Sequence, residues 1–252
     1  MDLGIKNKKV LVVGASKGIG RATAIAFAKE GAVVSVVARS EDLLVDLVNE
    51  MGGESLGHRH RGADLLESGV PVSVVKSLES DSGEFDIVVH CVGGGTGARD
   101  PLSSTEEWKK DWDLNVGIAI DINNHIVPKM RERGWGRVIH VSSISGESLR
   151  GNALYAVSKK CLTAYSTVLG REVAQDGVVV SAVMPGAVSF DGSYWDKAKD
   201  QETEKYNDFL RHHQAIGRMG TTEEIAAHIV FLSSEQASFA TGAAIAVDGG
   251  TM

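Results

Sequence analysis

The sequence predicts an α/β protein in which helices cover both faces of a seven-stranded parallel sheet. Short, nearly continuous apolar runs alternate with helical patterns from one end of the chain to the other. Apolar runs of this kind are typical of strands that are buried on both faces, as in a parallel sheet. No linker, repeat or low-complexity segment divides the chain. We therefore expect residues 1–252 to form one domain with a doubly wound topology.

The strands and helices are expected in strict alternation. The seven strands are expected near residues 10–13, 32–38, 55–63, 85–91, 137–141, 178–184 and 243–247. The helices are expected over residues 21–29 and 41–51, then in a segment ending near 80, over 112–133, from about Tyr155 to 175, and over 222–232. Between the last two helices, residues 189–216 are charged and aromatic, and we expect them to form a lid over the substrate or, alternatively, packing and subunit contacts.

Composition excludes several classes of function. The 252 residues include 26 Lys and Arg against 33 Asp and Glu, a formal net charge of −7, whereas nucleic-acid binding favours a basic surface. The N-terminus lacks the apolar core of a secretory signal, and no apolar run approaches the ~20 residues of a membrane helix. Neither of two histidine pairs has Cys, Asp or Glu neighbours at metal-site spacing. We expect a cytoplasmic protein with no nucleic-acid, membrane or metal partner.

A glycine-rich turn connects the first strand to the first helix. Glycines here permit a tight turn and let backbone amides approach a pyrophosphate, whose charge the helix N-terminus stabilises. The turn is no Walker loop, because Gly20 is followed by Arg-Ala rather than Lys-Ser or Lys-Thr. The predicted dinucleotide contacts in this turn are Gly14, Ser16, Lys17, Gly18, Ile19 and Gly20.

The end of the second strand indicates which dinucleotide is bound. NAD-specific proteins usually place a carboxylate there for the ribose 2′-hydroxyl, but this chain has Ala38, Arg39 and Ser40. A guanidinium can hold a 2′-phosphate through a bidentate, charge-assisted contact, and Lys17 adds a second positive charge. We therefore predict NADP(H) as the cofactor. Asp64, after the third strand, is expected at the adenine edge, and Gly93, after the fourth, near the adenosine ribose.

The chemistry is predicted to lie between Ser142 and Lys159. Tyr155 and Lys159 are four residues apart, so on a helix they share one face. A phenol with an ordinary pKa of ~10 is a poor base at neutral pH, and we expect the nearby ammonium to lower it. The strand just upstream ends in two serines, either of which could deliver a hydroxyl to this acid–base pair.

These motifs, in this order, resemble those of the short-chain dehydrogenase/reductase family, and in particular its 3-oxoacyl-acyl-carrier-protein reductase-like members. The resemblance covers essentially the whole chain. It rests on Gly14-xxx-Gly18-x-Gly20, Asp64, Asn115, the Ser142/Ser143 pair, Tyr155-xxx-Lys159, Pro185-Gly186 and Val247-Asp-Gly-Gly250.

The resemblance implies a single Rossmann-like domain and a role for each matching residue. Tyr155 would exchange a proton with the substrate oxygen, while Lys159 would hydrogen-bond the nicotinamide ribose. The serine would orient the substrate, and Asn115 would support a water chain to Lys159. Pro185, Gly186 and Val188 would close over the nicotinamide carboxamide, with Leu149 and Met184 as further candidates for the pocket wall. The family also implies a homotetramer, although the sequence does not distinguish it from a dimer.

Two features depart from the family pattern. His90-Cys91-Val92-Gly93 replaces the usual Asn-Asn-Ala-Gly after the fourth strand. Ser143 has Gly146 three residues on but lies 12 residues before Tyr155 instead of 13, whereas Ser142 has the usual separation but the wrong distance to the glycine. We favour Ser143 as the catalytic serine.

The sequence therefore predicts an NADP(H)-dependent oxidoreductase that interconverts a ketone and a secondary alcohol, with Tyr155 as general acid/base. Two alternatives stay open: an NAD-dependent catabolic alcohol dehydrogenase and a non-catalytic dinucleotide-binding regulator. The set Asn115, Ser143, Tyr155 and Lys159 argues against a regulator, because a pure binding protein has no need of an acid beside the nicotinamide.

Overall fold

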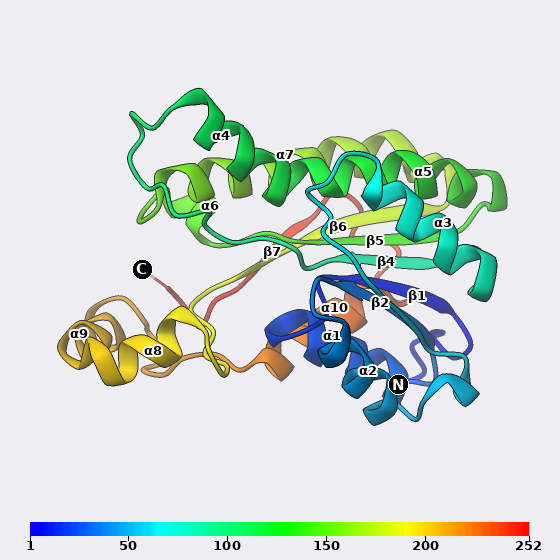
Figure 1. Ribbon diagram of the computed structural model, residues 1–252, viewed down its shortest axis with the longest axis horizontal. Coiled ribbons are helices and arrows are strands. Elements are labelled where there is room, and N and C mark those ends of the chain that lie inside the picture. Colours follow the sequence, from blue (N-terminus) through cyan, green and yellow to red (C-terminus); the bar gives the residue numbers. More distant parts are fainter. Residues whose placement is uncertain (252) are drawn as a thin grey trace.

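A computed structural model describes residues 1–251 and confirms the doubly wound α/β architecture (Figure 1). The sheet has seven parallel strands in the order β3-β2-β1-β4-β5-β6-β7. The order reverses between β1 and β4, and in such sheets ligands bind at that point, beyond the carboxyl ends of the strands. The strands are β1 (Lys9–Val13), β2 (Val33–Ala38), β3 (Arg59–Gly62), β4 (Ile87–His90), β5 (Gly136–Val141), β6 (Val178–Pro185) and β7 (Ala244–Val247).

Helices cover the two faces of the sheet as separate layers. In Figure 1, α3, α5 and α7 lie on one face, and α1, α2 and α10 lie on the other. The helices are α1 (Gly18–Lys29), α2 (Glu41–Glu50), α3 (Val70–Ser82), α4 (Thr105–Trp112), α5 (Ile118–Arg133), α6 (Ser145–Ser148), α7 (Ala153–Val173), α8 (Tyr194–Gln201), α9 (Thr203–His212) and α10 (Thr222–Leu232).

Each buried strand supplies both layers of the core. In β1, Val10 and Val12 pack with the side chains of α1, α2 and α10, while Leu11 and Val13 pack with those of α3 and α5. Successive side chains of a strand point to opposite faces, which is why an unbroken apolar run suits a sheet covered twice. The continuous apolar runs in the sequence are therefore explained by strands whose two faces are both buried.

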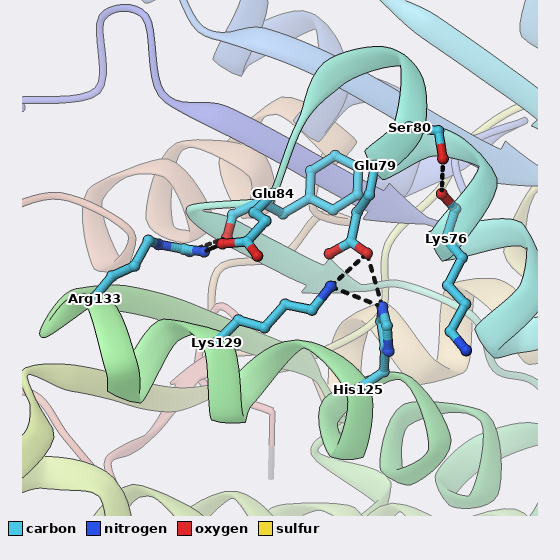
Figure 2. A network of polar contacts seen from close by, with 8 residues as sticks. Lys76, Glu79, Ser80, Glu84, His125, Lys129 and Arg133 are labelled. Carbon is cyan, nitrogen blue, oxygen red and sulfur yellow. Dashed lines mark hydrogen bonds and ion pairs between the residues drawn. The ribbon is translucent and has the colours of Figure 1, made fainter.

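A polar contact ties α3 to α5 over one of these layers (Figure 2). The Glu79 carboxylate of α3 accepts hydrogen bonds from His125 and Lys129 of α5, both at 2.7 Å. The Glu79 side chain is only 9% exposed, so this contact compensates the burial of its charge. It fixes the position of α3 far from the carboxyl ends of the strands.

Two regions differ from the sequence-based expectation. The third strand is shorter than predicted, because a 3-10 turn (Glu54–Leu56) occupies its first residues. The helix expected over residues 112–133 is in fact α4, a π-helical turn (Asp113–Gly117) and α5 in succession. The chain becomes helical earlier because Ser104 and Glu107 form a reciprocal capping box at the start of α4.

The charged, aromatic segment forms the helical pair α8–α9, which projects beyond one end of the sheet (Figure 1). Its rings pack against one another: the Trp195 ring lies 4.3 Å from that of Phe209, 5.1 Å from Tyr194 and 6.4 Å from Tyr206, centroid to centroid. Much of its aromatic content therefore stabilises the pair itself. Within residues 1–251, no helix combines the length and apolar character needed to cross a membrane.

Candidate active site

A cavity of about 780 Å³ opens at the carboxyl ends of the central strands. Every predicted site residue lines it except Gly18 and Asn115. The predicted residues on the wall are Gly14, Ser16, Lys17, Ile19, Gly20, Arg39, Ser40, Asp64, Gly93, Ser143, Tyr155, Lys159, Pro185, Gly186 and Val188. The fold thus brings together residues that are up to 174 positions apart in the chain, from Gly14 to Val188.

The glycine turn packs β1 tightly against α1. A Cβ at Gly20 would approach the carbonyl oxygen of Gly14 to 2.2 Å, and one at Gly14 would come within 2.7 Å of the Val92 amide nitrogen. Only glycine fits at these positions. No side chain caps the N-terminus of α1, and its first turn holds no acidic residue. The amides at this end of α1 are therefore available to an anion.

The end of β2 presents positive charge to the cavity. Arg39 and Lys17 both line it, and neither makes an ion pair with any residue in 1–251. Glu41, the first carboxylate after Arg39, turns to β3 instead, where its Oε1 lies 3.2 Å from Nε2 of His60. This edge of the cavity therefore offers two cationic side chains to an anion.

The two serines after β5 both line the cavity, but their hydroxyls have different partners. The Ser142 hydroxyl donates to the Lys159 carbonyl oxygen at 2.8 Å and contacts the Thr163 hydroxyl at 2.8 Å, so it binds the body of α7. Ser143 faces Tyr155, and its Oγ also accepts a hydrogen bond from the Ser145 amide at 3.1 Å. The geometry favours Ser143 as the serine that reaches a substrate.

Tyr155 and Lys159 lie on one face of α7, whose first turn is capped by Asn152. The Asn152 side chain accepts a hydrogen bond from the Tyr155 amide at 3.2 Å. The Lys159 Nζ lies 5.7 Å from the Tyr155 ring and donates to the Val141 carbonyl oxygen at 2.9 Å. The ammonium is thus held between the end of β5 and the phenol, with further N–H donors for the cavity.

The expectation that Lys159 lowers the pKa of Tyr155 is wrong for the protein without cofactor. Burial raises the pKa of the phenol, an effect that hydrogen bonding from Ser143 only partly offsets. Burial also lowers the pKa of Lys159 to about 8. Desolvation is therefore the main influence on both pKa values, and the phenol is protonated at neutral pH.

Asn115 lies in the π-helical turn and holds the loop after β4. Its Oδ1 accepts from the Gly94 amide at 3.0 Å, and its Nδ2 donates to the Gly94 carbonyl oxygen at 3.0 Å. A Cβ at Gly93 would meet both the Lys159 Nζ, at 2.6 Å, and the Asn115 Oδ1, at 2.7 Å. Asn115 is therefore next to Lys159 but separated from the cavity by the loop backbone. π-Helical turns are frequent at functional sites.

His90 and Cys91, which replace two asparagines of the family pattern, have different surroundings. The His90 Nε2–H donates to Asn123 Oδ1 at 2.9 Å, and Asn123 Nδ2 donates to His140 Nε2 at 3.0 Å, with the two imidazoles stacked 5.0 Å apart. A histidine pair linked by one amide thus holds β4 to β5. Cys91 lines the cavity, and burial raises its pKa to about 12, so its thiol stays protonated.

Some wall residues were not predicted from the sequence. Lys110, Leu114 and Ile118 line the cavity at helical spacing, a pattern that could have found them. Thr96 also lines the cavity, and so do Phe190, Tyr194 and Trp195, which belong to the segment expected to form the lid. Leu149 and Met184 do not belong to the wall: Leu149 is 63% exposed and Met184 is buried. Within residues 1–251, no group of three His, Cys, Asp or Glu is arranged to hold a metal ion.

Comparisons with known proteins identify sequences that are similar to this chain over nearly its whole length. Residues 14–252 match the family described as enoyl-(acyl carrier protein) reductase. The chain is 31% identical over 252 residues to the 3-oxoacyl-[acyl-carrier-protein] reductase of Escherichia coli, covering 98% of each chain. It is also 31% identical over 249 residues to a short-chain reductase, NovJ, of Streptomyces niveus, covering 95% of this chain and 92% of the other.

Solved structures extend the comparison to bound ligands. L-sorbose reductase from Gluconobacter frateurii, complexed with NADPH and L-sorbose, superposes with a TM-score of 0.91 at 33% identity, over 100% of this chain and 99% of the other. A 7α-hydroxysteroid dehydrogenase complexed with NADH gives a TM-score of 0.88 at 26% identity, over 98% and 95% of the two chains.

Together the fold, the site and these matches define an oxidoreductase class that binds a nicotinamide dinucleotide and acts on carbonyl or alcohol substrates. The chain belongs to the short-chain dehydrogenase/reductase family.

Proposed function

We propose that the protein is an NADP(H)-dependent oxidoreductase that interconverts a ketone and a secondary alcohol, with Tyr155 as general acid/base. The observation that carries this proposal is one cavity that contains both the Ser143–Tyr155–Lys159 set and the unpaired cation of Arg39. The Ser143–Tyr155–Lys159 set would transfer the proton, and the Arg39 guanidinium would favour a dinucleotide whose ribose carries a phosphate.

The residues present fit a nicotinamide dinucleotide phosphate. The open N-terminus of α1 and the glycines that pack against it accommodate a pyrophosphate, and Arg39, Ser40 and Lys17 are placed to hold a 2′-phosphate. Gly93, Pro185, Gly186 and Val188 would form the wall on the adenosine ribose and nicotinamide sides. When bound, the cofactor supplies the hydride.

The side chains around the substrate position have separate tasks. The Ser143 hydroxyl orients the substrate oxygen toward the Tyr155 phenol. Because burial raises the pKa of that phenol, it carries a proton at neutral pH and can donate it to a carbonyl oxygen as the alcohol forms. Lys159 keeps positive charge beside the oxygen that becomes negative, and it has N–H groups left for a ribose hydroxyl. This arrangement favours carbonyl reduction.

We infer that residues 189–216 act as the lid over the substrate. Phe190, Tyr194 and Trp195 line the cavity from this segment, and they suit a carbonyl compound with apolar bulk. Ser193, whose Oγ accepts from the Asp196 amide at 3.1 Å, starts α8 beside them. The remaining rings stabilise the lid itself.

We also infer a homotetramer. Two separate parts of the surface expose large apolar side chains: Val157 and Val168 on α7, and Phe231 and Phe239 around the end of α10. Apolar side chains that are exposed in groups mark protein interaction sites. Val168→Asp should dissociate the assembly into a smaller species in light scattering, and Phe239→Asp should do the same through the second surface. A wild-type monomer would contradict this inference.

The proposed activity is tested by following nicotinamide absorbance with a panel of ketones and alcohols, with NADPH and NADH in parallel. We expect ketone reduction with a clear preference for NADPH, and its loss in Tyr155→Phe while cofactor binding is retained. A preference for NADH would defeat the cofactor assignment. Cofactor binding without turnover of any substrate, unaffected by Tyr155→Phe, would indicate a binding protein instead.

A further inference from the structure

Asp111 is a carboxylate buried directly behind the candidate active site. It lies in the last turn of α4, four residues before Asn115, and is 0% exposed. Its Oδ1 accepts a hydrogen bond from Asn115 Nδ2 at 3.1 Å. Its Oδ2 is contacted by the amide and the hydroxyl of Thr96, at 3.4 and 3.3 Å. No part of the sequence pattern assigns this residue a task.

These contacts by themselves compensate the charge poorly. Two of the three hydrogen bonds are longer than the usual 2.7–3.2 Å range, and all three donors are neutral. Burying a carboxylate costs several kcal/mol unless an opposite charge or strong hydrogen bonds offset the cost. Within residues 1–251, Asp111 makes no ion pair at contact distance. The rest of the compensation for the negative charge of Asp111 must come from a positive charge slightly farther away.

Helix α4 packs against α7, and the Asp111 carboxylate acts electrostatically on Tyr155 and Lys159 of that helix. Burial is the main influence on the pKa of each, and the Asp111 carboxylate raises both. Lys159 is only 3% exposed, and among the described residues no carboxylate contacts it directly, so its buried charge needs compensation as well. Cys91 also faces Lys159, but its thiol is neutral because burial raises its pKa to about 12. Asp111 and Lys159 are therefore the two opposite charges of this buried region.

Asp111 also takes part in both hydrogen-bonded contacts that hold the loop of the cavity wall. The wall between β4 and α4 includes residues 93–96 of the loop 93–97, which has four glycines. Glycine gives a loop the greatest conformational freedom. Asn115 holds this loop at Gly94, and Asp111 holds it at Thr96. Since Asn115 itself donates to Asp111, both attachments depend on the same carboxylate.

We propose that Asp111 is a positioning residue, whose carboxylate holds the 93–97 loop and the Asn115 amide in place and acts as the buried counter-charge of the Lys159 ammonium. The inference rests on the proposed function for its effect on catalysis, but not for its effect on the loop. Asp111 acts through Asn115, Thr96 and Lys159 and touches neither cofactor nor substrate.

The effect on the loop is tested by amide hydrogen exchange of the protein without cofactor. Asp111→Asn keeps the shape but removes the charge and one acceptor, and we expect exchange across residues 93–97 to accelerate about tenfold or more, because local opening becomes easier. Thr96→Val should accelerate exchange in the same segment. Asp113→Asn is the matched control: it removes a charge two residues away that is half-exposed and paired with Lys109, and exchange should not change.

The effect of the charge is tested by the pH profile of alcohol oxidation, which requires the Tyr155 phenolate. Removing a negative charge lowers the pKa of the phenol, so in Asp111→Asn the rise in rate should move to lower pH by about 0.5 to 1 unit. Thr96→Val and Asp113→Asn should leave the position of this rise unchanged, because neither alters a buried charge. A purely structural role would change the rate without moving the profile.

The outcomes separate this inference from the proposed function. If the wild type oxidises no alcohol, the proposed function fails, and hydrogen exchange still decides the role of Asp111 in the loop. If Asp111→Asn folds, as judged by circular dichroism, and neither its exchange at residues 93–97 nor its pH profile differs from the wild type, the inference is wrong. If Asp111→Asn does not fold, unchanged exchange in Thr96→Val overturns it.

Discussion

The Phe190 ring lies directly over Gly18. A Cβ at position 18 would come within 2.7 Å of the Phe190 Cζ, and Gly18 adopts a φ of +58°. The first residue of α1 is therefore covered by the beginning of the segment that we infer to be the lid. Through this contact, the position of the lid and the shape of the turn that faces the pyrophosphate are coupled.

Gly18→Ala should weaken NADPH binding by about tenfold or more, because a left-handed alanine costs roughly 1–2 kcal/mol and its methyl group would displace the ring. Adding Phe190→Ala should recover part of this loss. Fluorescence titration of NADPH measures both effects. Gly69→Ala is the control, since Gly69 has a similar φ of +77° but no atom near the added methyl group. Unchanged affinity in Gly18→Ala would contradict the coupling.

Arg39→Gln should lower kcat/KM with NADPH by about 10- to 100-fold, the value of a hydrogen bond between charged groups of ~1.5–3 kcal/mol. The kcat/KM with NADH should stay within a factor of about two, because the Arg39 guanidinium would contact only the 2′-phosphate. Steady-state rates with the two cofactors provide the measurement. Arg131→Gln, which removes a guanidinium that pairs with Asp176, should affect neither cofactor. Equal losses with both would show that Arg39 is structural.

Ser143→Ala should reduce kcat by about 10²-fold or more and leave the melting temperature nearly unchanged, because its hydroxyl faces the cavity. Ser142→Ala should do the reverse: it should lower the free energy of unfolding by about 1 kcal/mol, since a buried hydrogen bond to α7 is lost, and retain most activity. Rates and urea unfolding of the two variants are compared. Loss of activity in Ser142→Ala alone would reverse the assignment.

The histidine pair beneath β4 and β5 predicts a pH dependence of stability. Burial lowers the pKa of His90 to about 4 from an unfolded value near 6.5, and burial lowers that of His140 well below its usual range. As the pH falls from about 6.5 to 4, the unfolded chain takes up protons that the folded protein does not, so stability is lost in this window and is constant above it.

For His90 alone the loss amounts to about 3 kcal/mol at pH 4, measured by urea unfolding at a series of pH values. His90→Gln keeps a donor toward Asn123 but does not titrate, so it should reduce the dependence to the part that His140 contributes. His228→Gln, at an exposed position on α10, should not. A wild-type stability that is constant from pH 7 to pH 4.5 would disprove this account.

Much of the fold could be predicted because burial on both faces leaves a direct mark on the sequence. The apolar runs of β1, β4 and β6 can be recognised without tertiary information. The short motifs that contain Gly14, Tyr155 and Lys159 can be recognised by the spacing of residues within each motif. The helix α4 was missed because its mostly exposed residues show little apolar periodicity, although Ser104-x-x-Glu107 at its start is a sequence signal for a helix N-terminus. The π-helical turn that presents Asn115 has no sequence signal of its own.

The electrostatics of the site could not be predicted from residue types. A tyrosine near a lysine suggests a lowered phenol pKa, but burial, which depends on the packing of the surrounding loops, raises it in Tyr155. Asp111 was likewise invisible, because an aspartate in a charged stretch is usually exposed, and only the packing of α4 against α7 removes it from water. The pKa of a side chain depends on its burial and on neighbouring charges, and neither can be read from the residue type alone.

The body of α7 is attached to the end of β5 at one residue of the helix, through both its backbone and its side chain. The Lys159 carbonyl oxygen accepts a hydrogen bond from the Ser142 hydroxyl, and the Lys159 ammonium donates to the Val141 carbonyl oxygen. The position of the ammonium relative to the strand is therefore set by these two bonds and not by the length of the turn between Gly146 and Asn152. A change of length in that turn would leave the ammonium where it is.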